Sequence, residues 1–195
     1  MKKLIVALLV VMIGGTLGVG IAYAYTHTFS EPWSTSYQTC TYKMQDTFGS
    51  LSKTQFADAC VHWNGQLTKN FLYKSSSDTA EVIPYENGNK TVTRRAFGVN
   101  GIVGECYRYL NSENKVKETD INLNTSYPFA NSKLAGYYDV QSILTHELGH
   151  TLRVGHSTVS ADTMYNPIPT NTDYARTVTT ADRDAARAST ARWFQ

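Results

Sequence analysis

The chain has 195 residues, of which 42% are hydrophobic and 17% charged, and its formal net charge is +2. This length and composition suit one domain with a single sizeable core. The 18 basic residues are scattered and form no stripe, so the sequence lacks the electrostatic signature of a nucleic-acid-binding protein. No nucleic acid and no other charge-driven partner is expected.

The first 24 residues have the pattern of a secretory signal peptide. Lys2 and Lys3 precede an apolar run over residues 4–22, and residues 22–24 (AYA) offer a cleavage site. We expect residues 1–24 to be removed and the remaining domain, residues 25–195, to be secreted and extracellular. The alternative is an uncleaved membrane anchor with the domain facing outside, although four glycines within the run weaken it as a spanning helix.

The first predicted elements are a strand and a helix. Polar and aromatic side chains alternate over residues 36–44, which predicts a strand. A helix is predicted over residues 53–64, because Ser52 and Gln55 form a capping-box pattern and apolar residues recur at helical spacing after it. Gly65 is expected to end this helix.

The middle and end of the chain complete a mixed pattern. Strand-like runs separated by Asn, Gly and Ser turns cover residues 79–84, 91–99, 104–110 and 118–124. A second helix is predicted after Asp139, which is suited to cap it. Residues 166–169 must be extended because of their prolines, and a closing helix is predicted over residues 181–193. Together these elements predict an α+β fold, a twisted mixed sheet of about five strands with three helices.

Three cysteines, Cys40, Cys60 and Cys106, lie outside the histidine-rich segment described next. In an oxidising compartment we expect one disulfide and one free, buried thiol. The sequence does not indicate which two cysteines pair.

The helix that follows Asp139 carries the segment HELGHTLRVGH, residues 146–156. His146 and His150 would lie about one helical turn apart on one face, where both imidazoles can reach a single ion. Glu147 lies about 100° round the helix from His146, beside the ion without having to bind it. This pattern predicts a catalytic zinc site with Glu147 as its general base.

A third ligand requires the chain to reverse. If the helix continued, the side chain of His156 would point about 240° away from His150 and lie roughly 9 Å further along the axis. We therefore expect the helix to end first, with Gly155 supplying backbone freedom for the turn. The alternative third ligand is a downstream glutamate, and residues 151–195 contain none, so His156 is the predicted ligand.

The segment resembles the zinc-binding motif of metzincin metallopeptidases, H-E-x-x-H-x-x-G-x-x-H followed by a methionine turn. Met164 lies eight residues after His156, and the pair Met164-Tyr165 is similar to the matrixin branch, the matrix-metalloprotease type of catalytic domain. The similarity extends over residues 36–195. Arg153 departs from it, standing where the family usually has a turn glycine; a left-handed arginine would cost roughly 1 kcal/mol, which a packed domain can absorb.

The resemblance implies a zincin-like α/β fold and a zinc-dependent endopeptidase. By this resemblance His146, His150 and His156 hold one catalytic Zn²⁺, and Glu147 takes a proton from the water in the fourth position. Met164 would then pack beneath the metal and support the site without binding the ion. The implied substrate is an extended peptide or protein, and a monomeric enzyme is expected.

Further expectations concern the substrate and other metals. The peptide is expected to pair antiparallel to the strand around residues 120–124, with residues 165–169 lining a side-chain pocket. Only His27 and His62 remain outside the motif, so a second, structural zinc is not expected. A structural Ca²⁺ is possible in principle, but no compact Asp/Asn loop indicates one.

Two alternatives stay open at this point. One is a zinc-binding surface protein without catalysis, which would have no need of Glu147. The other is the same peptidase tethered to the membrane by an uncleaved N-terminal helix.

Overall fold

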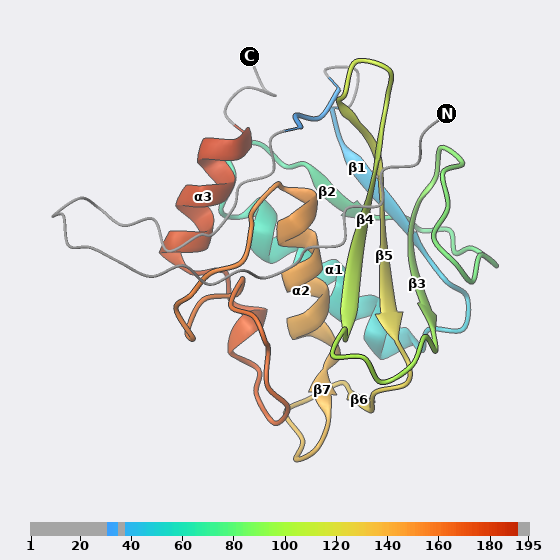
Figure 1. Cartoon of the computed structure of the whole chain (residues 1–195), viewed down its shortest axis with the longest axis vertical. Helices are drawn as coiled ribbons and strands as arrows, with labels where there is room; N and C mark the ends of the chain where they lie inside the picture. The colour runs from blue at the N-terminus through green and yellow to red at the C-terminus, as the bar shows by residue number, and fades with distance from the viewer. Residues whose placement is uncertain (1–30, 35–37, 191–195) are drawn as a thin grey trace, which may run out of the picture.

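The computed structural model describes residues 31–34 and 38–190, so the predicted signal peptide lies outside the described residues. Two helices cover one face of a five-stranded sheet, and a third helix packs outside them (Figure 1). Within the described part of the chain, no helix is long and apolar enough to cross a membrane.

The main sheet contains β1 (Cys40–Met44), β2 (Leu72–Lys74), β3 (Lys90–Arg95), β4 (Gly104–Leu110) and β5 (Val116–Asn124). The strands lie in the order β2-β1-β3-β5-β4. Strands β2, β1, β3 and β5 are mutually parallel, and the edge strand β4 is antiparallel to β5. A separate small sheet pairs β6 (Phe129–Ala130) with β7 (Tyr138–Asp139). This confirms the predicted α+β fold and its mixed sheet.

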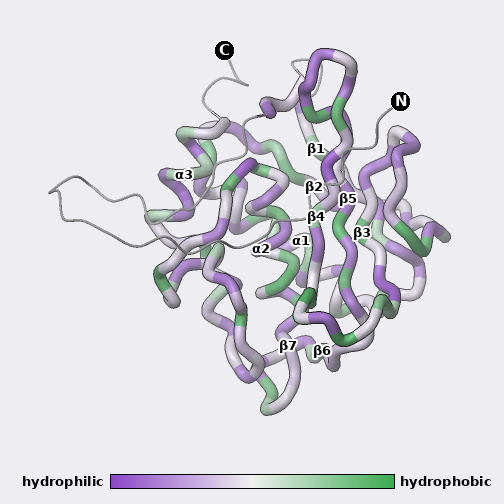
Figure 2. Tube along the Cα trace, viewed as in Figure 1, coloured by the Kyte–Doolittle hydropathy of each residue, from purple (hydrophilic) through white to green (hydrophobic). Residues whose placement is uncertain are grey.

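The helices are α1 (Ser50–Asn64), α2 (Val140–Thr151), α3 (Thr180–Thr190) and a short 3-10 helix, η1 (Tyr174–Arg176). The core between the sheet and the first two helices contains fully buried large side chains: Tyr42, Phe56, Trp63, Ile121, Leu144 and Leu148. The indole N–H of Trp63 donates to the Thr145 carbonyl at 2.7 Å, so α1 is fixed across the middle of α2. By contrast, the turn between β4 and β5 is strongly hydrophilic (Figure 2).

The predicted strand over residues 79–84 is wrong, and β2 takes its place in the sheet. In that segment only Thr79 forms a β-bridge, with Gln45, while Val82 and Ile83 are exposed. β-branched residues favour a strand only when a partner strand and a core are there to receive them. The three residues of β2 were too few to show an alternating pattern.

The predicted capping box is also wrong. Helix α1 begins at Ser50 with Gly49 as its N-cap, and no side chain caps it. Ser52 therefore lies inside the first turn, where its hydroxyl donates to Asn131 Oδ1 at 2.9 Å. Gln55 donates to the Asn131 carbonyl at 2.6 Å, so the pair fastens α1 to the loop after β6.

All three cysteines are free, so the expected disulfide is wrong. Cys40 on β1 and Cys106 on β4 are separated by three strand spacings, about 14 Å, whereas bridged cysteines need Cα atoms within about 7 Å. The Sγ atoms of Cys40 and Cys106 lie near the hydroxyls of Thr119 (3.8 Å) and Thr151 (3.6 Å). Burial raises the pKa of Cys40 to about 11 and that of Cys106 to about 12, so both are protonated, unreactive thiols.

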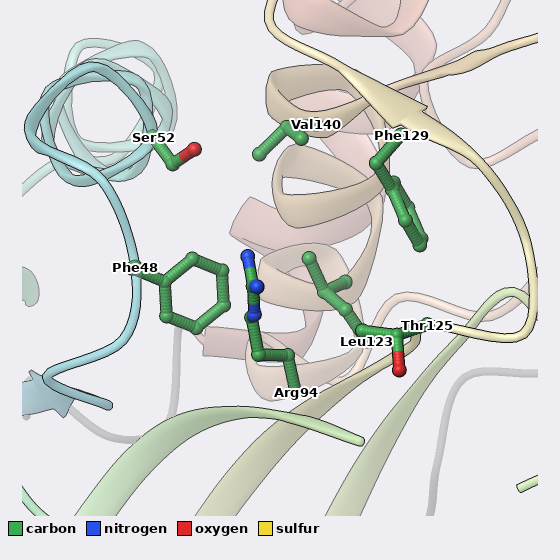
Figure 3. Close-up of a pocket in the computed structure, with 7 residues that line it drawn as sticks. All are labelled: Phe48, Ser52, Arg94, Leu123, Thr125, Phe129 and Val140. Carbon is green, nitrogen blue, oxygen red and sulfur yellow. The ribbon is translucent and has the colours of Figure 1, made fainter. Parts of the chain in front are cut away.

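A small cavity of about 30 Å³ lies between the start of α1, the start of α2 and the ends of β3 and β5. Figure 3 shows Arg94 beside the ring of Phe48 there, with its guanidinium carbon 5.5 Å from the ring centre. The seven lining residues include no histidine and no carboxylate, so this cavity is separate from the histidine site described below.

Candidate metal centre

Helix α2 places the first two histidines. Asp139 caps it as predicted, accepting the Ser142 N–H at 2.8 Å, and its carboxylate also accepts a hydrogen bond from Arg176 at 2.9 Å. Leu144 and Leu148 bury the opposite face of the helix in the core. The face that carries the histidines is thereby turned away from the core, towards the segment that follows the helix.

The reversal after α2 is made by Arg153 and not by Gly155. Arg153 has φ 69°, in the left-handed region, whereas Gly155 has no positive φ. The N–H of Val154 bonds back to the Gly149 carbonyl at 2.9 Å, which closes the helix end. The Arg153 guanidinium donates to the Ser189 carbonyl at 3.0 Å, so packing against α3 helps to hold the strained residue.

The reversal brings His156 back to the other two histidines. One ring nitrogen from each of His146, His150 and His156 lies within 4.8 Å of the others. The ring centres are 4.9 to 5.2 Å apart, and Nε2 of His150 lies 3.2 Å from Nε2 of His156. The three predicted ligands therefore converge on one point.

Hydrogen bonds at the opposite ring nitrogens orient these histidines. Nδ1 of His146 donates to the Thr163 carbonyl at 2.9 Å, and Nδ1 of His150 donates to the Val154 carbonyl at 2.8 Å. Asn166 lies beside Nδ1 of His156, at 3.3 Å. With Nδ1 engaged in this way, Nε2 is the nitrogen left to bind a metal, as in other histidine-ligated sites.

The electrostatic setting favours neutral imidazoles. Burial, followed by the neighbouring His156, lowers the pKa of His146 to about 4. Burial lowers the pKa of His150 well below its usual value and also lowers that of His156. Three neutral imidazole nitrogens suit a borderline cation such as zinc better than calcium or magnesium, which prefer oxygen. The residues present therefore fit a zinc ion.

Glu147 lies next to this cluster without belonging to it, and its side chain is only 5% exposed. It packs against the backbone of Gly104, the first residue of β4: a Cβ at position 104 would be 2.7 Å from Glu147 Oε1. Burial, and then the charge of Glu105, raise the pKa of Glu147 to about 8. A cation bound by the three histidines would lower this pKa again, which leaves the carboxylate ionised and able to accept a proton near neutral pH.

Met164 is fully buried against the helix that carries the ligands. A Cβ on Gly149 would meet its Sδ at 2.2 Å, so the sulfur lies directly against the backbone between the two helical ligands. The Met164 carbonyl accepts the N–H of Ser157 at 2.7 Å, which joins this turn to the residue after His156.

Sequence reasoning missed the role of Asp182. This fully buried carboxylate at the start of α3 accepts the N–H groups of Thr163 and Met164, at 2.9 and 3.3 Å. It also accepts the N–H and hydroxyl of Thr179, and its own N–H bonds to that hydroxyl. The T-x-x-D pattern of a capping box at 179–182 was the available signal for this carboxylate's position, although not for its contact with the methionine turn.

The strand expected to receive a peptide is also corrected. β5, which contains residues 120–124, has β3 on one side and β4 on the other, so its backbone is already paired. The sheet has two edge strands, β2 and β4, and β4 is the one that contacts Glu147 through Gly104. A peptide that adds to this sheet near the histidines must therefore add to β4.

Three converging neutral imidazoles beside a buried carboxylate and an edge strand define the class of zinc metallopeptidases. The sequence profile of the matrixins matches residues 31–189, and the chain belongs to the matrixin family. It is accordingly a zinc metalloendopeptidase, with a catalytic zinc and with peptides or proteins as substrates.

Among solved structures, a similar one is high choriolytic enzyme 1, a hatching enzyme zinc-protease from Oryzias latipes (medaka fish). The two chains are 12% identical, with a TM-score of 0.41 over 86% of this chain and 94% of the other. No curated protein sequence matches this chain.

Proposed function

We propose that the protein is a secreted endopeptidase in which His146, His150 and His156 hold the catalytic zinc and Glu147 is the general base. The observation that carries this assignment is the convergence of the three ring nitrogens within 4.8 Å, with the Glu147 carboxylate buried alongside.

In this proposal Glu147 carries protons between the attacking water and the leaving amine. When bound, zinc supplies a Lewis acid that polarises the scissile carbonyl and lowers the pKa of a water molecule to about 7. Glu147 accepts the proton from the attacking water. It then donates that proton to the amine that leaves as the peptide bond breaks. The apolar packing around Glu147 and the backbone of Gly104 hold its carboxylate in one place through both transfers.

The substrate in this proposal is an extended peptide that pairs antiparallel to β4. No strand lies beside the outer edge of β4 among the residues that the structure describes. Main-chain hydrogen bonds to an edge strand bind a peptide with little regard to its sequence. Selectivity must therefore come from side chains near the scissile bond.

Localisation and domain limits are also proposals. The basic start and apolar run over residues 4–22 support secretion after cleavage near residue 24, which leaves residues 25–195 as a monomeric catalytic domain. The same apolar run supports the tethered form as the second candidate. Sequencing the mature N-terminus separates the two.

The central test is the Glu147→Ala variant. We expect purified protein to contain one zinc per chain and to cleave peptides, and the variant to keep its zinc while kcat/KM falls roughly 10³-fold, because the proton acceptor is lost. Glu113→Ala, at an exposed position between β4 and β5, is the matched control and should retain full activity. Undiminished cleavage by Glu147→Ala would refute the mechanism, and a zinc-bound wild type without activity would favour a non-catalytic protein.

A further inference from the structure

The C-terminal end of helix α2 lies between two of the proposed zinc ligands. His150 is in the last turn of the helix, and His156 follows the reversal after it. The last four carbonyl groups of a helix have no partner within that helix. Here three of them, at residues 148–150, accept N–H groups from residues 152–154, just past the helix end. The fourth, the carbonyl of Thr151, accepts a hydrogen bond from a distant part of the chain.

The donor to this carbonyl is Trp33. Its indole N–H lies 118 residues away in the sequence and donates to the Thr151 carbonyl at 2.9 Å. The residue is only 2% exposed, and its ring packs edge to face on Phe71 with ring centres 5.5 Å apart. Backbone hydrogen bonds tie the residues on either side of it to Val116, the first residue of β5, at 2.7 and 2.8 Å. Trp33 therefore holds the helix end from a fixed position.

The side chain of Thr151 is held from the sheet as well. Its hydroxyl lies 2.8 Å from the Tyr42 hydroxyl on β1, which in turn lies 2.5 Å from the Thr119 hydroxyl on β5. The Cys106 thiol on β4 lies 3.6 Å from the same Thr151 hydroxyl. Burial raises the pKa of Tyr42 well above its usual value, so its hydroxyl stays protonated and can donate. Both the carbonyl and the hydroxyl of Thr151 thus have partners outside α2.

We propose that Trp33 and Tyr42 are positioning residues for the metal centre, which act through Thr151 on the adjacent ligand His150. This inference rests on the proposed function and adds two residues to the support of its metal site. A metal-binding constellation must be held to within about 0.5 Å of its working geometry. Without its outside partners the last turn of α2 would fray, which would displace His150 and the turn that carries His156 back.

The N-terminal segment of the domain thereby gains a part in activity. Cleavage near residue 24, as proposed above, leaves residues 31–34 in place. Trimming beyond Trp33 would remove the donor to Thr151 and the β-bridge that pairs Trp33 with Val116. Proteolysis within this segment would then lower zinc affinity as well as stability.

The test replaces Trp33 by phenylalanine, which keeps an aromatic ring in the core and removes the N–H donor. We expect the zinc Kd, measured by chelator competition, to rise about tenfold, as for other residues that orient metal ligands. At saturating zinc, kcat should fall about tenfold while KM stays within about twofold of wild type, since the peptide binds to β4.

Phe48→Leu is the matched control for this variant. Phe48 is a buried aromatic residue that lines a cavity with Val140, at the opposite end of α2 from Thr151. The substitution should lower stability through lost packing. It should leave the zinc Kd and kcat within about twofold of wild type, because a loss of stability changes an apparent Kd only when an appreciable fraction of the protein is unfolded.

Variants of Thr151 separate positioning from packing. Thr151→Ser keeps the hydroxyl and should bind zinc like wild type, whereas Thr151→Val removes it and should raise the zinc Kd about as much as Tyr42→Phe does. The double variant should be no worse than either single variant, because both remove the same hydrogen bond. In metal-free protein, hydrogen exchange at the Val154 amide should be about tenfold faster in Trp33→Phe, which tests the helix end without zinc.

The inference would be overturned if Trp33→Phe and Thr151→Val lowered stability alone and left zinc Kd, kcat and hydrogen exchange unchanged. The contacts would then be packing and nothing more. If Trp33→Phe did not fold, the comparison of Thr151→Ser with Thr151→Val would decide in the same way. A wild type that binds zinc without cleaving peptides would count against the proposed function only, since the Kd and exchange comparisons would still decide the positioning role.

Discussion

Gly149 illustrates how little room the ligand-bearing helix has. Alanine is about 1 kcal/mol better than glycine inside a helix, so propensity alone predicts that Gly149→Ala stabilises the protein. The added Cβ, however, would lie 2.2 Å from Met164 Sδ and 2.9 Å from the Trp63 ring. Overpacking of a dense core costs about 1–3 kcal/mol and forces neighbours to shift. We expect net destabilisation and a lower zinc affinity.

Urea unfolding and zinc titration of Gly149→Ala check this prediction. The double variant with Met164→Ala should lose less than the sum of the two single variants, since removing the sulfur makes room for the methyl group. If Gly149→Ala were as stable as wild type, Met164 would have to move aside freely, which would contradict its packing role beneath the metal site.

The residues of the site show what sequence can and cannot predict. His146 and His150 follow from helical spacing alone, because both lie on one continuous helix. The sequence also indicated that the chain must reverse before His156, but it did not indicate which residue makes the turn. Glycine is the usual left-handed residue, so Gly155 was the natural choice, whereas the strain sits at Arg153. That choice depends on the contact with Ser189 in α3, which no local pattern contains.

At the scale of elements, the start of α3 supports the methionine turn. Asp182→Ala would leave buried donors from Thr163, Met164 and Thr179 without their acceptor. Each buried unpaired donor costs about 1–3 kcal/mol, so we expect a loss of several kcal/mol in stability. Zinc affinity should fall too, by about 10- to 100-fold, because the Thr163 carbonyl orients His146.

Asp184→Ala is the matched control for this substitution, since Asp184 lies on the exposed side of the same helix. Thermal unfolding and competition with a zinc chelator would measure the two effects. If Asp182→Ala bound zinc as tightly as Asp184→Ala, the link from α3 through Thr163 to the metal centre would be wrong.

Elements defined by interactions between residues close in the sequence could be predicted, whereas elements defined by pairing with distant strands could not. Helix α2 carries its own cap and periodicity, so sequence placed its start correctly at Asp139. The long strands β4 and β5 were also readable from composition and turns. β2 was missed and residues 79–84 were misassigned, since pairing with β1 and not local propensity decides which short segment joins the sheet. The same limit concealed that β5 is an interior strand.

Folding of the whole domain is coupled to pH by a buried carboxyl group, Asp120, on the face of the sheet that points away from the helices. Asp120 on β5 is fully buried; its Oδ1 accepts from the N–H and hydroxyl of Thr91, while Oδ2 has no partner within the described residues. Burial, with nearby Glu118 and Glu81, raises its pKa from 3.8 to about 7. The folded state thus holds a proton that the unfolded chain releases near pH 4. Stability from this group is full below pH 4 and is lost as pH rises towards 7.

The variant Asp120→Asn should remove this loss, because an amide keeps the acceptor for Thr91 and carries no charge. We expect the variant to exceed wild type in unfolding free energy at pH 8 by on the order of 3 kcal/mol, and the difference to shrink steadily towards pH 4. Wild type and variant must be compared at each pH, because the buried histidines also make stability depend on pH. Their pKa values are lowered, so they make both proteins more stable as the pH rises. Urea unfolding at saturating zinc, from pH 4.5 to 8, measures it. A difference independent of pH would mean that Asp120 is ionised throughout, and the excess negative charge around Glu118 and Glu81 would then have to be balanced by another group on that face.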